Sequence, residues 1–191
     1  MSKKPTLSRR EVCRIGLVSG LAVPLGALAQ PQDDRAPQRP RRGDLLVFDD
    51  TARRGQIITP ESLELDAQPV PAFARDPLTG ELRDGSRLNR VMVMRTDPAG
   101  LSPATARSAA DGIIAYSAVC THTGCDVTNW NPENLWMACP CHESQFDVRD
   151  TGRVTGGPAP RPLAMLPLVI EDGQLKVARA FTGRVGFQQE F

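Results

Sequence analysis

The sequence predicts a mainly β domain of antiparallel strands with few short helices, and three observations favour this fold class. Short apolar runs broken by turn residues recur from Asp44 onward, which is the pattern of strands in an antiparallel sheet. The 191 residues include 17 prolines and 16 glycines, which disfavour long helices. The turn signal Glu171-Asp172-Gly173 separates two of the apolar runs and predicts a tight hairpin.

We expect strands at the apolar runs and loops between them. The only candidate helix is the stretch SPATARSAA, residues 102–110, whose first residue, Ser102, can serve as an N-cap. Residues 71–88 contain turn residues and few apolar ones, and we expect a loop-rich insertion there. The expected strands are residues 45–48, 56–58, 90–95, 112–119, 135–139, 166–170 and 174–181.

The first 29 residues have the layout of an export signal. A basic stretch leads into an apolar run, residues 15–29, which ends in the small-residue pattern Ala27-Leu28-Ala29. This run is shorter than the ~20 residues that cross a bilayer comfortably. The letters SRREVC, residues 8–13, resemble the twin-arginine export signal, which implies a folded, periplasmic product. An ordinary export signal and an uncleaved anchor in the inner membrane are the alternatives.

Residues 30–43, QPQDDRAPQRPRRG, contain no large apolar side chain and predict a polar linker rich in proline and arginine. Residues 44–191 then form one domain. The chain is 40% hydrophobic and 24% charged, which indicates a folded protein. Its formal net charge is only +1, and much of the basic excess lies in the export signal. The domain therefore has no general attraction for nucleic acid.

Two short boxes hold most of the side chains that could bind a metal. The chain has five cysteines and two histidines. Four of the cysteines and both histidines lie in the first box, CTHTGC at residues 120–125, and the second box, CPCH at residues 139–142. Each box follows an expected strand, so a rigid scaffold can present it on a loop. Two sulfurs and two imidazoles suit a tetrahedral zinc or a binuclear iron–sulfur centre.

The residues alone leave alternatives open at these boxes. Zinc would leave two cysteines without a role, and two disulfides with incidental histidines are a further possibility. The spacing does not decide whether Cys120 and Cys139, or Cys125 and Cys141, would be the ligands.

The boxes resemble the signature of Rieske [2Fe–2S] proteins, C-T-H-x-G-C followed by C-P-C-H-x-S. The resemblance implies that Cys120 and Cys139 bind one iron and that His122 and His142 bind the other. It also implies a disulfide between Cys125 and Cys141, which suits an exported protein. The implied fold is a Rieske-type antiparallel β-sandwich with a small cluster-binding subdomain, about residues 115–168.

Other residues near the boxes resemble the same family. The stretch GGPAPRPL, residues 156–163, resembles the loop that covers the cluster in Rieske subunits of quinol–cytochrome c reductases. The covering residues would be Gly157, Pro158, Ala159 and Pro160. Ser144 matches a serine that donates to a bridging sulfide, and Phe146 stands where high-potential members carry a donating tyrosine. One donor present and one absent imply an intermediate potential, unless Phe146 serves only as core packing.

The resemblance implies a single-electron carrier with no substrate-converting site of its own. Because the chain has no further histidine, it lacks the mononuclear iron site of Rieske oxygenases. The expected partner is a redox protein: cytochrome c, a cytochrome b-type quinol-oxidising subunit, or a molybdenum subunit. Membrane association would then come through the partner.

Three contexts remain open for such a carrier. The first is the Rieske subunit of a quinol–cytochrome c reductase, although Thr123 replaces the usual leucine and Glu143 a glycine. The second is the small subunit of a molybdenum enzyme resembling arsenite oxidase, and the third is a free-standing carrier. A zinc-stabilised binding module is the alternative from another functional class.

Overall fold

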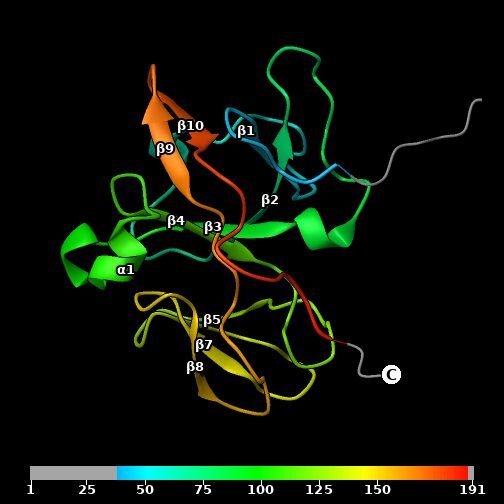
Figure 1. The fold of residues 1–191 in the computed structure, drawn as a ribbon. Coiled ribbons are helices and arrows are strands. Elements are labelled where there is room, and N and C mark those ends of the chain that lie inside the picture. Colours follow the sequence, from blue (N-terminus) through cyan, green and yellow to red (C-terminus); the bar gives the residue numbers. More distant parts are fainter. Residues whose placement is uncertain (1–37, 189–191) are drawn as a thin grey trace, which may run out of the picture. The chain divides into compact units, whose positions relative to one another are not determined.

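The computed structural model describes residues 38–188, which form two antiparallel sheets (Figure 1). The prediction of a mainly β fold is confirmed. The predicted export signal lies outside the described residues, as do residues 30–37 of the predicted linker. In the larger sheet the strand order is β4-β3-β2-β1-β10-β9, and in the smaller sheet it is β5-β6-β7-β8.

The larger sheet consists of β1 (Leu45–Phe48), β2 (Val70–Arg75), β3 (Val91–Arg95), β4 (Ile113–Ser117), β9 (Leu168–Glu171) and β10 (Gln174–Val177). The smaller sheet consists of β5 (Asn129–Asn131), β6 (Trp136–Ala138), β7 (Gln145–Asp147) and β8 (Arg153–Gly156). The helices are short: α1 (Pro103–Ala106) and the 3₁₀ turns η2 (Pro60–Ser62), η3 (Arg87–Asn89) and η4 (Pro98–Gly100).

Six of the seven expected strands form where the apolar runs predicted them, namely β1, β3, β4, β6, β9 and β10. The seventh, residues 56–58, contributes only an isolated bridge between Ile57 and Val47. The predicted hairpin joins β9 to β10, with Gln174 opposite Glu171. Asp172 and Gly173 both have positive φ, 54° and 71°, as a two-residue hairpin turn of the type I′ class requires.

The predicted insertion at residues 71–88 is wrong over its first part, because β2 occupies Val70–Arg75. Pro71 conceals this strand in the sequence, since proline disfavours the interior of a sheet. It lies at the second residue of β2, where its carbonyl still accepts a hydrogen bond from the Asp49 N–H. Only the residues from Asp76 to the beginning of η3 form the expected loop.

The expected helix at residues 102–110 is shorter than predicted. Ser102 is its N-cap and accepts a hydrogen bond from the Thr105 N–H. The helix ends at Ala106, and Ala110 pairs with Ile113 in an isolated antiparallel bridge.

The last residues of the predicted linker, 38–43, pack on the domain. Pro40 is buried. The side chain of Gln38 accepts a hydrogen bond from the Arg83 guanidinium, and the Gly43 N–H donates to the Val177 carbonyl over 2.8 Å. The side chain of Arg83 is 1% exposed and contacts three carboxylates, with its closest approaches 3.2 Å to Asp44, 3.0 Å to Asp76 and 3.2 Å to Glu81.

Strands β3 and β4 separate two apolar cores because their side chains alternate between the two faces. Val91, Val93, Ile113 and Ala115 enter the core of the larger sheet. The residues between them pack instead with Met137 and Phe146 of the smaller sheet and with Cys120 and Cys139. The two boxes are therefore anchored in the second core. No helix among residues 38–188 is long and apolar enough to cross a membrane.

Candidate metal centre

The two boxes fold into loops with the same backbone pattern, called loop 1 (residues 120–125) and loop 2 (residues 139–144). In loop 1 the Cys120 N–H donates to the Cys125 carbonyl over 2.8 Å, and the Gly124 N–H donates to the Cys120 carbonyl over 3.2 Å. In loop 2 the Cys139 N–H donates to the Ser144 carbonyl, and the Glu143 N–H donates to the Cys139 carbonyl, both over 2.9 Å. In each loop, the main chain of the first cysteine is therefore hydrogen-bonded to the last two residues of the same loop.

Each loop leaves the scaffold at a strand end. Loop 1 follows β4, and an isolated bridge between Val119 and Asp126 closes its base. Loop 2 connects β6 to β7. The first cysteines of the loops, Cys120 and Cys139, are buried and carry free thiols.

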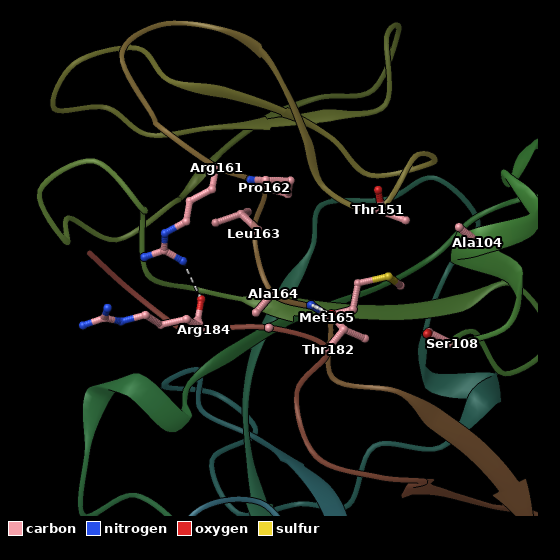
Figure 2. Close-up of a pocket in the computed structure, with 11 residues that line it drawn as sticks. Ala104, Ser108, Thr151, Arg161, Pro162, Leu163, Ala164, Met165, Thr182 and Arg184 are labelled. Atoms are coloured by element: carbon pink, nitrogen blue, oxygen red, sulfur yellow. Dashed lines mark hydrogen bonds between the residues drawn. The ribbon is translucent and has the colours of Figure 1, made fainter. Parts of the chain in front are cut away.

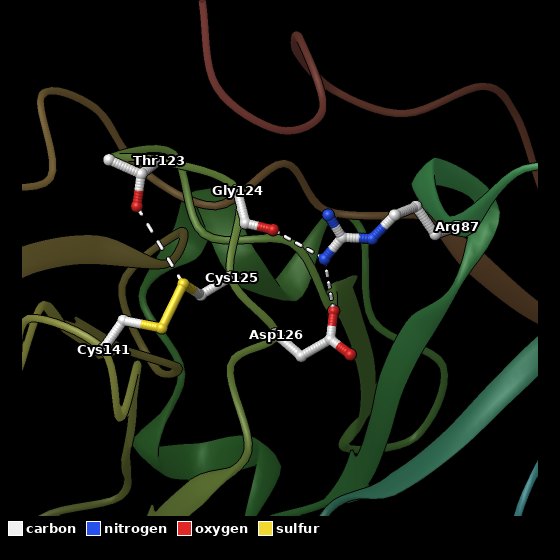
Figure 3. The surroundings of a disulfide bond; sticks show 6 residues. All are labelled: Arg87, Thr123, Gly124, Cys125, Asp126 and Cys141. Carbon is white, nitrogen blue, oxygen red and sulfur yellow. Dashed lines mark hydrogen bonds and ion pairs between the residues drawn. A yellow bond between two sulfur atoms is a disulfide. The ribbon is translucent and has the colours of Figure 1, made fainter.

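A disulfide between Cys125 and Cys141 links the two loops, and the predicted pairing is confirmed (Figure 3). The two Cα atoms are 6.5 Å apart. On the outer side of loop 1, the Arg87 guanidinium donates to the Gly124 carbonyl over 2.6 Å and to the Asp126 carboxylate over 2.7 Å. The disulfide and Arg87 thus brace loop 1 from two directions.

The two histidines of the chain lie against one another. Their ring centroids are 4.7 Å apart and the rings meet edge to face, at 87°. His122 is half-buried, and its Nδ1 atom is buried with no hydrogen-bond partner among the described residues. His142 is exposed. A buried ring nitrogen without a partner costs free energy unless another group binds it, so the geometry suits a metal ligand.

The two free thiols face the same region. Burial raises the pKa of the Cys120 thiol, and the neighbouring Cys139 thiol raises it further. The Ser144 hydroxyl lies near enough to lower the pKa of Cys120, yet its Oγ is buried with no hydrogen-bond partner within residues 38–188. A hydroxyl in this position can donate to a sulfur-rich group between the loops.

The arrangement disfavours a metal site built from cysteines alone. The sulfur atoms of Cys125, Cys139 and Cys141 lie within 4.8 Å of one another. Two of these three sulfurs form the disulfide, however, and a disulfide sulfur is not a thiolate ligand. Two buried thiols and two facing imidazoles remain, which is the donor set of a [2Fe–2S] centre with mixed ligands.

The proline-rich loop at residues 157–160 packs on loop 2. A Cβ atom at Gly157 would lie 2.5 Å from the Ser144 Cα, and Gly157 has a φ of +77°, so only glycine fits there. Ala159 packs against the core that contains Cys120 and Cys139. At the end of the loop, the Thr121 hydroxyl donates to the Arg161 carbonyl over 2.7 Å.

Phe146 lies in β7, which places its side chain in the second core. Its partner across the strand pair is Met137. Phe146 is fully buried. Arg87 and Phe187 contact loop 1 at Gly124 from distant parts of the chain, and no sequence motif predicted these contacts. Gly124 was the one available signal, since a glycine in a tight box often marks the close approach of another group.

Residues 78–167 match the Rieske [2Fe–2S] domain family. The chain is 40% identical over 77 residues to the cytochrome bc1 complex Rieske iron-sulfur subunit of Streptomyces lividans, a match that covers 40% of this chain and 45% of that protein. It is 45% identical over 76 residues to a putative respiratory nitrate reductase Rieske subunit of Haloferax mediterranei, covering 39% of this chain and 34% of that protein.

Among solved structures, the chain is 27% identical to the plasma membrane Rieske protein PetC3 from Synechocystis PCC 6803. That alignment covers 58% of this chain and 85% of the other, with a TM-score of 0.37. The chain spans less than half of the length of each of these two curated relatives.

Proposed function

This chain carries a Rieske [2Fe–2S] domain, and from that premise we propose that it transfers single electrons between respiratory redox partners in the periplasm. Cys120 and Cys139 would hold one iron, and His122 and His142 the other. The observation that carries this assignment is the buried Nδ1 atom of His122, which has no hydrogen-bond partner in the described part of the chain and lies beside the His142 ring and two buried thiols. When bound, the cluster supplies one-electron redox chemistry at a potential raised by its imidazole ligands.

The residues around the cluster would hold it in place and control the access of water and partners. The disulfide tethers loop 2 to loop 1, and the proline-rich loop packs on loop 2 at Ser144. His142 is the exposed ligand and would face the redox partner, whereas His122 is half-buried. Electrons would therefore enter or leave on the His142 side.

Metal analysis and EPR spectroscopy test the cofactor assignment. The purified chain should contain about two irons and two acid-labile sulfides, with a reduced-state EPR signal of mixed histidine and cysteine ligation. His122→Ser should abolish that signal, whereas Thr123→Ser, one residue away and exposed, should preserve it. Stoichiometric zinc without iron would instead support the zinc-stabilised module.

We propose a quinol–cytochrome c reductase as the complex, since the Streptomyces lividans relative is described as a cytochrome bc1 subunit. The Haloferax relative favours a second candidate, a subunit of another respiratory oxidoreductase. The sequence suggested one such enzyme, a molybdenum enzyme resembling arsenite oxidase. Purification of the tagged chain from native membranes distinguishes them. A co-purifying b-type cytochrome supports the first candidate, and a molybdenum-containing partner supports the second.

The periplasmic location and the domain boundaries rest on the sequence alone. Signal cleavage after Ala29 would leave residues 30–43 as a short leading segment before the domain. Replacing Arg9 and Arg10 together with lysine should retain the cluster-loaded precursor in the cytoplasm if the twin-arginine pathway exports it. Normal periplasmic accumulation of this double variant would contradict that route.

A further inference from the structure

The segment after β10 turns back from the larger sheet toward loop 1. We call residues 182–188 the C-terminal strap. Thr182 fixes its beginning, because its N–H donates to the Met165 carbonyl over 2.9 Å and its hydroxyl accepts from the Met165 N–H over 3.0 Å. Phe187 lies near its end, against loop 1.

The strap approaches loop 1 too closely to be a loose tail. A Cβ atom at Gly124 would lie 2.5 Å from Cδ1 of the Phe187 ring, so the ring rests directly on the loop backbone. Gly186 is buried, and a Cβ atom there would lie 2.9 Å from a methyl group of Leu88. Both glycines also have a positive φ, +85° at Gly124 and +75° at Gly186, which residues with a side chain rarely adopt.

Arg161 fastens the strap. Its guanidinium donates to the Arg184 carbonyl over 2.8 Å, shown in Figure 2, and also to the Gly186 carbonyl. No carboxylate among the described residues pairs with Arg161. Both contacts go to main-chain oxygens, and the planar fork of arginine suits two such acceptors held at fixed positions.

Arg161 also contacts loop 1 directly, through its main-chain carbonyl. The Arg161 carbonyl accepts the hydrogen bond of the Thr121 hydroxyl, while its guanidinium holds the strap whose Phe187 ring lies on Gly124. These contacts form a closed circuit from loop 1 through Arg161 and the strap, and back to loop 1. His122 lies between Thr121 and Gly124, inside that circuit.

The middle of the strap is not held by close packing against the domain. A cavity of about 340 Å³ lies beside it, lined by residues that include Ala104, Ser108, Leu163 and Gly183 (Figure 2). The strap thus borders a hollow between its anchor at Thr182 and its contact at Phe187, and the two bonds from Arg161 fix that stretch.

We infer that Arg161 is a positioning residue, which clasps the C-terminal strap over loop 1 and so holds the His122 imidazole in place. This inference extends the proposed function. It rests on that function only in taking His122 as a cluster ligand. The strap covers loop 1 and leaves the exposed His142 of loop 2 to the redox partner.

The test compares three variants of the full-length, cluster-loaded protein by hydrogen exchange. Arg161→Gln removes the clasp, and Arg161→Lys keeps the charge without the fork. Arg184→Gln is the matched control, because it removes a charge in the strap while leaving the main-chain carbonyl that Arg161 contacts. Amide exchange in residues 120–126 should rise about tenfold in Arg161→Gln and remain unchanged in Arg184→Gln, since two charge-assisted hydrogen bonds are lost only in the former. Arg161→Lys should lie nearer to Arg161→Gln.

A second readout follows the cluster itself. Bleaching in the presence of an iron chelator should accelerate in Arg161→Gln, and the reduced-state EPR signal should broaden because His122 is less well fixed. Phe187→Ala loosens the opposite end of the strap. Because Phe187 is 36% exposed, this variant should fold and show the same local increase in exchange.

Several results would overturn the inference. Exchange could remain at the wild-type rate in both Arg161→Gln and Phe187→Ala, or it could rise equally in Arg184→Gln, which would indicate a charge effect. A uniform rise across β3 and β4 as well would indicate general destabilisation. A wild-type protein without iron would refute the proposed function, while the exchange comparison would still decide whether the clasp exists.

Discussion

Removing the disulfide should destabilise the domain measurably while the cluster still assembles. The double variant Cys125→Ser/Cys141→Ser opens a covalent loop between residues 16 apart in the sequence. By chain-entropy arguments, closing a loop of this length stabilises the folded state by about 3 kcal/mol. The hairpin of β5 and β6 lies within the loop and already orders part of it, so the loss should not exceed this value. A loss of this size lowers the ratio of folded to unfolded protein by roughly two orders of magnitude.

Native-state hydrogen exchange is the suitable assay, because cluster loss makes denaturant unfolding irreversible. The slowest amides, expected in the buried strands β3 and β4, report global unfolding. Their exchange should accelerate by up to about a hundredfold in the double variant, and bleaching should be faster than in wild type. Cys120→Ser serves as the comparison, since it should prevent cluster assembly. If the double variant also failed to bind iron, the division of the cysteines into ligands and disulfide would be wrong; unchanged core exchange would refute the entropic estimate.

Three further predictions test separate contacts. Arg83→Met should lower the melting temperature by about 10 °C, because it leaves the buried Asp44 carboxylate without its cationic partner; a change under about 2 °C by calorimetry would contradict this. Gly157→Ala should accelerate cluster bleaching, because its methyl group would collide with the backbone of Ser144, whereas Gly156→Ala meets only a movable side chain and should bleach at the wild-type rate. Phe146→Tyr should raise the reduction potential in film voltammetry if the added hydroxyl reaches a cluster sulfur, and an unchanged potential would assign Phe146 to core packing alone.

The sequence predicted the larger sheet better than the smaller one for a physical reason. Strands such as β3 and β4 are buried on both faces, so they read as continuous apolar runs. The strands β5, β7 and β8 are three or four residues long and carry few buried side chains, so they contain no apolar run. Only pairing with their neighbours makes them strands, and pairing is not visible in a local pattern.

The same distinction applies to the site. The two boxes and the proline-rich loop are short motifs, and their resemblance to a family, not their spacing, implied the disulfide pairing that the structure contains. The contacts of Arg161 with Arg184 and Gly186 join residues 23 and 25 positions apart, and Arg87 reaches Gly124 from 37 positions away. No periodicity encodes such contacts, because they depend on where the chain returns after β10.

The two loops share a backbone conformation but carry different residues at one equivalent position, because the surroundings of that position differ. Gly124 and Glu143 hold equivalent positions, and both have a positive φ, 85° and 56°. At Gly124 the Phe187 ring fills the space above the backbone, so no side chain fits. Glu143 is exposed, so its side chain can extend into solvent, and the left-handed conformation costs roughly 1–2 kcal/mol. A glutamate is therefore tolerated at this position of loop 2, whereas the Phe187 ring occupies the space that a side chain would need in loop 1.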